Sequence, residues 1–271
     1  MGLGGRRNME VKSNGVTFNC MVEGPEGAPW ITFSHALANN LTLWDDVAAA
    51  LRSDFRILRY DHRGHGKSEA VPGAYSFPML VEDAVGIWDA LGVTESHWVG
   101  LSIGGMMGYG MAIHQAARVK TLVTCDARPD APPDYAAYFQ YRIDTAREKG
   151  MDGLVEPSIE RWFTPAFRDR NPPALDKLRE MIRTTDPMGH EGNCEALKTL
   201  GYGPDLHRIT APTLVLGGAE DKGAPPDVLA AAAKKIPGAE HLVLPDAGHI
   251  TPLECPEAFL AALRDWFDRH G

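Results

Sequence analysis

The stretch HWVGLSIGGMMGYG (residues 97–110) places one serine, Ser102, between a short apolar run and a segment rich in glycine and methionine. Its middle fits the pattern Gly-x-Ser-x-Gly, in which a strand turns sharply into a helix. The turn is strained, so the positions two before and two after the serine, Gly100 and Gly104, must be small. The pattern predicts a serine hydroxyl that stands above the edge of a sheet, beside the first turn of a helix.

Strand and helix signals alternate on both sides of this turn. Short apolar runs predict strands at 16–22, 30–34, 55–60, 96–99, 119–125, 213–216 and 241–244. Helical spacing of apolar residues predicts helices at 43–54, 78–91, 106–116, 227–236 and 256–270. An Asn14-Gly15 turn ahead of the first strand indicates an opening hairpin. This alternation is typical of an α/β fold with a mostly parallel central sheet and helices on both faces.

The alternation stops between residues 128 and 208. Prolines cluster there, and four helical segments follow one another with no strand between them. We therefore expect an α/β core formed by residues 1–127 and 209–271, interrupted by a helical cap at 128–208.

Composition excludes several classes of protein. The net charge of −9 lacks the basic stripe that nucleic acid requires, so no nucleic-acid partner is expected. No apolar run is long enough to span a membrane, and no signal peptide is recognisable. Four cysteines without metal-site or redox spacing fit reduced thiols in a cytoplasmic protein. No phosphate loop, dinucleotide fingerprint or zinc motif is complete, so we expect neither cofactor nor metal. The sequence does not indicate which oligomeric state the protein adopts.

A serine hydroxyl becomes a good nucleophile when a histidine accepts its proton and an acid orients that histidine. Asp221 lies just beyond the strand at 213–216, and His249 lies in the loop after the last strand. The chain order serine, aspartate, histidine is the one expected for this turn. Glu220 and Asp126 remain alternative acids, and the other histidines fit structural roles better.

The negative charge that develops in such a reaction needs two backbone N–H donors. One belongs to Ile103, directly after the serine, where the helix dipole also helps. The second is expected from Leu37, in the loop SHALANN (34–40) that follows the second buried strand. Ala36 stands in that loop where glycine is usual.

Over essentially its whole length the chain resembles the α/β-hydrolase superfamily, and it looks most like the 3-oxoadipate enol-lactonases. The stretches that carry this resemblance are RYDHRGHGKS (59–68), GLSIGG (100–105), ERWFTPAFR (160–168), TTDPMGHEGNCEAL (184–197), APTLVLGGAEDKGAPP (211–226) and AGHITPLECPEAF (247–259). The resemblance implies Ser102 as nucleophile, His249 as base and Asp221 as the acid that orients it. It also implies that the cap supplies substrate contacts. SHALANN and CDARPDAPPDYAAYFQYRI (125–143) depart from the family pattern near the expected pocket.

The expected function is cleavage of a small carboxylic ester or lactone through an acyl-enzyme, most like that of an enol-lactonase. A substrate of that type carries a free carboxylate, which calls for an arginine. Of the cap arginines (142, 147, 161, 168 and 170), Arg161 beside Trp162 is the leading candidate for a substrate contact. Three alternatives stay open: a general carboxylesterase, a perhydrolase or acyl transferase with the same triad, and a non-catalytic small-molecule receptor on the same scaffold.

Overall fold

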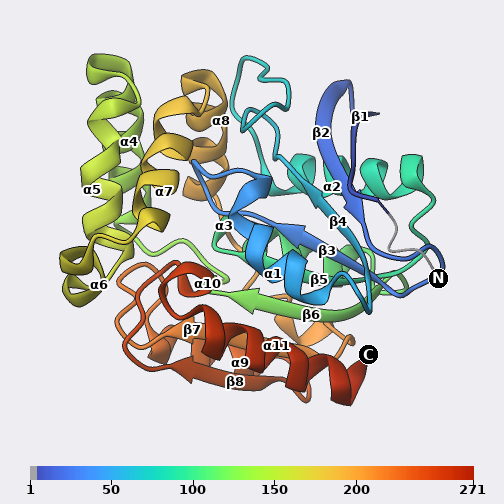
Figure 1. Ribbon diagram of the computed structural model, residues 1–271. Helices are drawn as coiled ribbons and strands as arrows, with labels where there is room; N and C mark the ends of the chain where they lie inside the picture. The colour runs from blue at the N-terminus through green and yellow to red at the C-terminus, as the bar shows by residue number, and fades with distance from the viewer. Residues whose placement is uncertain (1–4) are drawn as a thin grey trace.

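A computed structural model describes residues 5–271 as an eight-stranded sheet in the order β1-β2-β4-β3-β5-β6-β7-β8 (Figure 1). β1 and β2 form an antiparallel hairpin through Asn14 and Gly15, both with positive φ. β2 is antiparallel to β4, and every later pair is parallel. The mostly parallel sheet predicted from the sequence is therefore confirmed. The strands are β1 (Arg7–Ser13), β2 (Val16–Glu23), β3 (Trp30–Ser34), β4 (Arg56–Tyr60), β5 (Ser96–Leu101), β6 (Val119–Cys125), β7 (Thr213–Gly218) and β8 (Glu240–Leu244).

Helices cover both faces of this sheet, as expected. One face carries α1 (Asp45–Leu51) and α11 (Pro256–His270), which contact each other (Figure 1). The opposite face carries α2 (Phe77–Leu91), α3 (Ile103–His114) and α9 (Pro226–Lys235). Within residues 5–271, no helix is long and apolar enough to cross a membrane.

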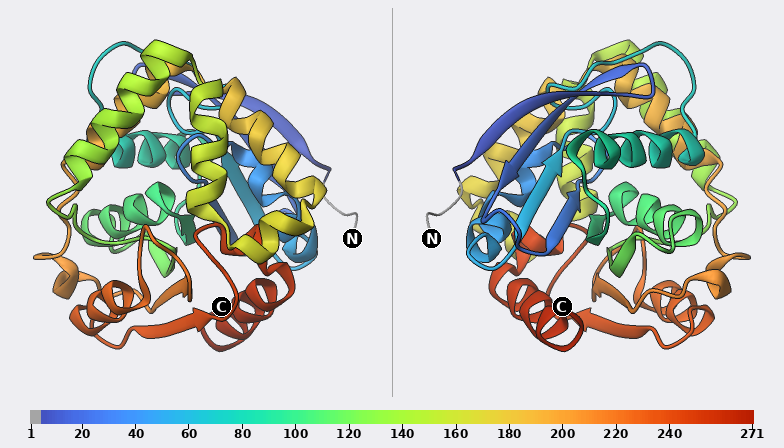
Figure 2. Two further views of the ribbon diagram at one scale, coloured as in Figure 1. Left: turned by 90° about the vertical axis from the view of Figure 1, so that its left-hand side faces the viewer. Right: turned by 90° about the vertical axis from the view of Figure 1, so that its right-hand side faces the viewer.

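Five helices separate β6 from β7 and gather at one end of the sheet (Figure 2). They are α4 (Tyr135–Lys149), α5 (Asp152–Trp162), α6 (Pro165–Arg170), α7 (Pro173–Thr184) and α8 (Pro187–Lys198). We call residues 128–208 the cap; the exact domain boundaries remain a prediction. The two ends of the cap pair with each other, because Asp130 and Gly201 form an isolated antiparallel bridge. Hydrogen bonds from Ala131 N to Leu200 O and from Tyr202 N to Pro129 O, both 2.9 Å, flank this bridge.

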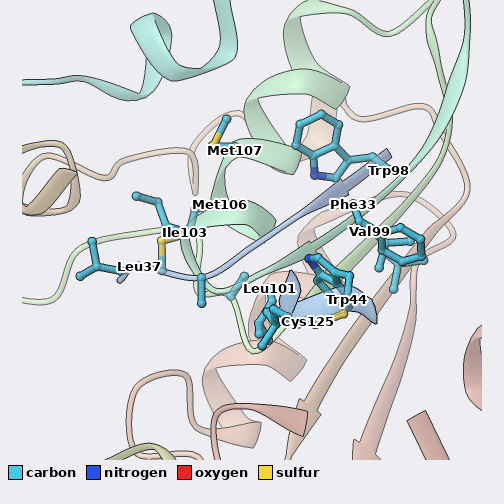
Figure 3. Packing of buried hydrophobic residues seen from close by; sticks show 14 of the residues in the cluster. Phe33, Leu37, Trp44, Trp98, Val99, Leu101, Ile103, Met106, Met107 and Cys125 are labelled. Carbon is cyan, nitrogen blue, oxygen red and sulfur yellow. The ribbon is translucent and has the colours of Figure 1, made fainter. Parts of the chain in front are cut away.

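The strand that leads to Ser102 lies in the middle of the core. All six residues of β5 are buried, as expected for a parallel strand covered on both faces. Figure 3 shows Trp98, Val99 and Leu101 among apolar side chains from neighbouring strands and from α3. Glycine is a poor helix former, yet α3 contains four. A Cβ at Gly108 would press on Trp98, so the glycine lets the helix approach the sheet closely.

Short elements differ from the sequence prediction. The sequence does not predict α6, the four-residue helix α10 (Thr251–Glu254), or the 3-10 turns at Leu41–Trp44 and Leu206–Arg208. These pieces are too short for an apolar period to show. His114, expected to be buried in its helix, is exposed at the last turn of α3.

Candidate active site

Ser102 occupies the turn between β5 and α3 with φ 53° and ψ −120°, a conformation that is strained for any residue with a side chain. Its N–H donates to Cys125 O at 2.8 Å, which ties the turn to β6. A Cβ at Gly100 would overlap Gly104 O, and a Cβ at Gly104 would overlap Ser34 O. The glycine pattern is thus explained by direct backbone contacts around the serine.

The three residues singled out by the sequence are joined by hydrogen bonds in series. Asp221 Oδ2 lies 2.8 Å from His249 Nδ1, and His249 Nε2 lies 2.9 Å from Ser102 Oγ. A carboxylate only accepts, so Nδ1 carries the proton and Nε2 is free to accept from the serine. Gly223 N donates to the other oxygen of Asp221 at 2.6 Å. All three side chains are buried, and each is placed by a loop at the same edge of the sheet.

The alternative acids are placed elsewhere. Glu220 is exposed. Asp126 is buried at the end of β6, where it accepts from Gly218 N at 2.8 Å and from Thr251 Oγ1 at 2.6 Å. This carboxylate braces the end of β7 against the start of α10, and His249 bonds to Asp221 instead.

Burial and neighbouring charges have opposite effects on the pKa of His249. Burial alone lowers the pKa of an imidazole, and the nearby Arg161 guanidinium lowers it further. The Asp221 carboxylate and its hydrogen bond, together with Asp126, outweigh both, so the pKa of His249 lies above its usual 6.5. Burial, followed by the charge of Asp221, raises the pKa of Asp126 well above the ordinary range.

The loop that carries His249 is held by the cap. His249 N donates to Trp162 O at 2.7 Å, at the end of α5. Gly248 N donates to Glu254 Oε2 at 2.7 Å, while Glu254 Oε1 accepts from Thr164 N at 2.9 Å and from its hydroxyl. Sequence reasoning missed Glu254. Its only signal is a lone carboxylate in the apolar stretch ITPLEC (250–255).

The backbone N–H groups of Leu37 and Ile103 are the predicted oxyanion donors. Within residues 5–271, neither Leu37 N nor Ile103 N is used by a turn, cap or side-chain acceptor. The positive φ in the Leu37 loop falls on Ala38 (57°), so alanine at position 36 meets no such demand. Ala38 N donates to His65 Nε2 at 2.9 Å, which holds the loop in place. His65 is thus a structural residue of the site.

A narrow cavity of about 30 Å³, partly open to solvent, is lined by Ser102 and His249. The core supplies Leu37, Ser102, Met106, Gly223 and His249 to its walls, and the cap supplies the rest. Both predicted substrate contacts, Arg161 and Trp162, line it. The further lining residues are Tyr135, Tyr138, Phe139, Arg142 and Leu197. The walls are largely aromatic and aliphatic, with polar groups at few points, as in small-molecule sites.

The fold and this arrangement agree with a family assignment. A family model described as the alpha/beta hydrolase fold matches residues 29–256. The chain belongs to the α/β-hydrolase fold family.

Within that family, enol-lactonases are among its relatives. The 3-oxoadipate enol-lactonase 2 of Acinetobacter baylyi is 31% identical over 249 residues, 90% of each chain. The enol-lactonase structure from Burkholderia xenovorans LB400 matches with a TM-score of 0.92 at 33% identity, covering 96% of this chain and 100% of that one. A malate-bound thermophilic esterase from Thermogutta terrifontis matches with a TM-score of 0.90 at 26% identity, covering 98% and 100%. The resemblance predicted from the sequence is confirmed.

Proposed function

We propose that this chain is a serine hydrolase that cleaves a carboxylic ester or lactone through an acyl-enzyme, and that its substrate is 3-oxoadipate enol-lactone. The observation that carries the proposal is the hydrogen-bonded series from Asp221 through His249 to Ser102, in a cavity lined by both the core and the cap. The relatives described above, two of them enol-lactonases, support the lactone as substrate.

In the proposed mechanism His249 Nε2 takes the proton of Ser102 as the hydroxyl oxygen attacks the carbonyl carbon. The N–H groups of Leu37 and Ile103 stabilise the resulting oxyanion. Collapse of the tetrahedral intermediate breaks the ester bond, and protonated His249 returns its proton to the departing oxygen. For an enol-lactone this oxygen leaves as an enol, which tautomerises to a ketone. Water activated by His249 then releases the free acid and regenerates the serine.

Replacing Ser102 by alanine tests the chemistry. We expect Ser102→Ala to lower kcat by about 10⁴ or more, because the nucleophile is lost and only binding and oxyanion stabilisation remain. A fluorophosphonate should label the native protein at Ser102 and leave the variant unlabelled. Asp221→Asn should lower kcat by about 10⁴ as well. Asp126→Asn is its matched control, and we expect it to stay within about tenfold of the native rate.

Substantial activity in Ser102→Ala would overturn the mechanism. The substrate is tested separately, by kcat/KM on 3-oxoadipate enol-lactone and on a simple 4-nitrophenyl ester. A preference for the lactone by several orders of magnitude supports the proposal. A preference for the simple ester leaves the mechanism standing and rejects the enol-lactone.

A further inference from the structure

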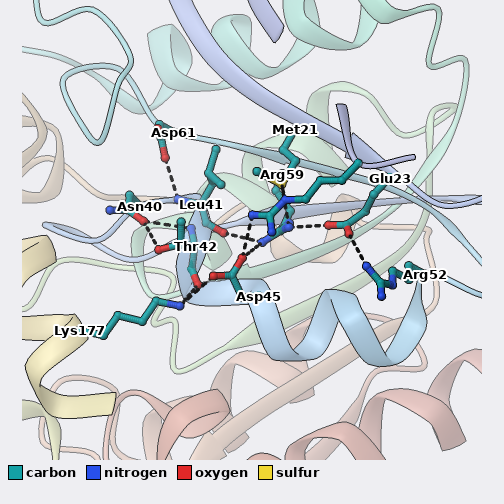
Figure 4. A network of polar contacts seen from close by, with 11 residues as sticks. Met21, Glu23, Asn40, Leu41, Thr42, Asp45, Arg52, Arg59, Asp61 and Lys177 are labelled. Atoms are coloured by element: carbon teal, nitrogen blue, oxygen red, sulfur yellow. Dashed lines mark hydrogen bonds and ion pairs between the residues drawn. The ribbon is translucent and has the colours of Figure 1, made fainter. Parts of the chain in front are cut away.

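Three arginines are buried in the part of the chain that the structure describes, and two of them have carboxylate partners. Arg59 pairs with Glu23 and Asp45 in the network of Figure 4. Arg63 pairs with Asp83 through two of its nitrogens. Burial of a charge is costly unless it is paired, so these partners are what physical chemistry requires.

Arg142 on α4 departs from this pattern. Its side chain is as buried as the other two, but no carboxylate within residues 5–271 lies within 4.0 Å of its guanidinium. Nη1 donates to neutral partners, Ser158 Oγ at 3.1 Å and Tyr138 Oη at 3.3 Å. Nε and Nη2 are buried and form no hydrogen bond with the described residues, and the guanidinium lies 5.9 Å and 5.8 Å from the ring centroids of Tyr138 and Trp162. The chain therefore keeps one buried positive charge without a counter-charge.

The position of Arg142 suggests why this charge has no partner within residues 5–271. Arg142 lines the cavity that contains Ser102 and His249. The same residue also lines a second, more open pocket together with Arg161, Lys222 and Glu160. Arg161 stacks on the ring of Tyr138, 4.4 Å from its centroid, and also has no carboxylate partner among the described residues. Two arginines without carboxylate partners among the described residues thus line both pockets.

We infer that Arg142 is the principal binding residue for an anionic group of the substrate, a carboxylate on the acyl chain, with Arg161 adding positive charge beside it. This inference rests on the proposed ester hydrolysis and specifies which esters the site prefers. A planar guanidinium with two free donor nitrogens matches a carboxylate in shape as well as charge. When bound, the carboxylate supplies the missing counter-charge and holds the chain so that its far carbonyl meets Ser102.

The test compares two esters of the same chain length, 4-nitrophenyl hydrogen glutarate and 4-nitrophenyl pentanoate, which differ by one negative charge. We expect the native protein to prefer the glutarate ester in kcat/KM. Arg142→Met should lower kcat/KM for the glutarate ester by about 100-fold or more, since a site built around hydrogen bonds and charge rejects a mismatch strongly. The same variant should change kcat/KM for the pentanoate ester by less than about threefold. Arg142→Lys keeps the charge and should retain part of the preference.

Two further variants separate the contributions. Arg161→Met should lower the glutarate preference by less than Arg142→Met does. In the Ser102→Ala background, the dissociation constant for the glutarate ester should rise when Arg142 is replaced, so binding is measured without turnover. The melting temperature of Arg142→Met should be unchanged or higher, because an unpaired buried charge is removed.

The outcomes separate a binding role of Arg142 from a structural role and from binding by Arg161. Equal losses on both esters would show that Arg142 only supports the fold, and would overturn the inference. Loss of the preference in Arg161→Met alone would assign the subsite to Arg161 instead. Absence of any glutarate preference in the native protein would also reject the subsite, while hydrolysis of the pentanoate ester that depends on Ser102 would leave the proposed function intact.

Discussion

At the scale of single residues, the catalytic candidates can be recognised from the sequence near them, whereas Arg142, the proposed substrate contact, cannot. Ser102 directly follows a strand, and Asp221 and His249 lie in the loops after two later strands, so strand ends and chain order single them out as candidates. Arg142 looks like the other cap arginines in the sequence. Only the folded chain shows that Arg147, Arg179 and Arg183 have carboxylate partners and that Arg142 does not.

The pH dependence of the reaction also belongs to this scale. In the proposed mechanism His249 acts as a base only when neutral, and its pKa lies above 6.5. We expect kcat/KM on a neutral ester to rise with pH through an acid limb whose midpoint exceeds 6.5. The Arg161 charge lowers this pKa, so Arg161→Met should move the limb to higher pH. Arg147→Met, which breaks an exposed pair with Glu191, should leave it unmoved; a shift in both variants would contradict the assignment.

At the scale of elements, the cap and the histidine loop share one carboxylate. Glu254 at the end of α10 accepts from Gly248, next to the histidine, and from Thr164, just after α5. Removing it leaves buried donors without an acceptor, and each such group costs about 1–3 kcal/mol.

We therefore expect Glu254→Ala to lower the free energy of unfolding by about 2–4 kcal/mol, measured in urea. Its kcat should fall more than its KM rises, because the imidazole shifts while the cavity walls stay. Glu257→Ala, at an exposed position three residues on, is the control and should change neither quantity. An unchanged kcat in Glu254→Ala would show that Trp162 O alone positions the histidine loop.

The same scale shows where sequence reasoning ends. Long elements such as α2, α11 and β6 fall within one residue of their predicted bounds, because their apolar pattern extends over many positions. Short elements such as α6 and α10 were not predicted, because they are too short for an apolar pattern to repeat. The strand order β2-β4-β3-β5 was not predicted either, since it depends on contacts between residues far apart in the chain.

At the scale of the whole molecule, buried histidines couple stability to pH. His35, in the Leu37 loop, packs against His62 and His65, which also contact each other. Burial lowers the pKa of His35 to about 4 and that of His65 to about 3, and that of His62 falls well below 6.5. Between these values and 6.5 the unfolded chain binds more protons than the folded one, so stability is full above pH 6.5 and falls as the solution is acidified.

Each such histidine should remove about 2 kcal/mol of unfolding free energy between pH 7 and pH 5. Burial raises the pKa values of Asp61, Asp83 and Asp126, and these carboxyl groups act in the opposite direction. Variants isolate the histidine contribution. The difference in unfolding free energy between pH 7 and pH 5 should shrink in His65→Gln and stay unchanged in His207→Gln, an exposed position. An equal pH dependence in the native protein and His65→Gln would contradict this prediction.

The bridge between Asp130 and Gly201 has a consequence for how such a molecule can change over evolutionary time. The segment that leaves β6 and the segment that returns to β7 are hydrogen-bonded to each other at this bridge. The connection between core and cap can therefore stay the same when the helices of the cap change. Closing a loop costs little more when the loop grows, so the intervening helices can be lengthened, shortened or exchanged at small entropic expense. The lining that the cap gives to the cavity can then change as one unit, while Ser102, His249 and Asp221 are inherited unaltered in the core.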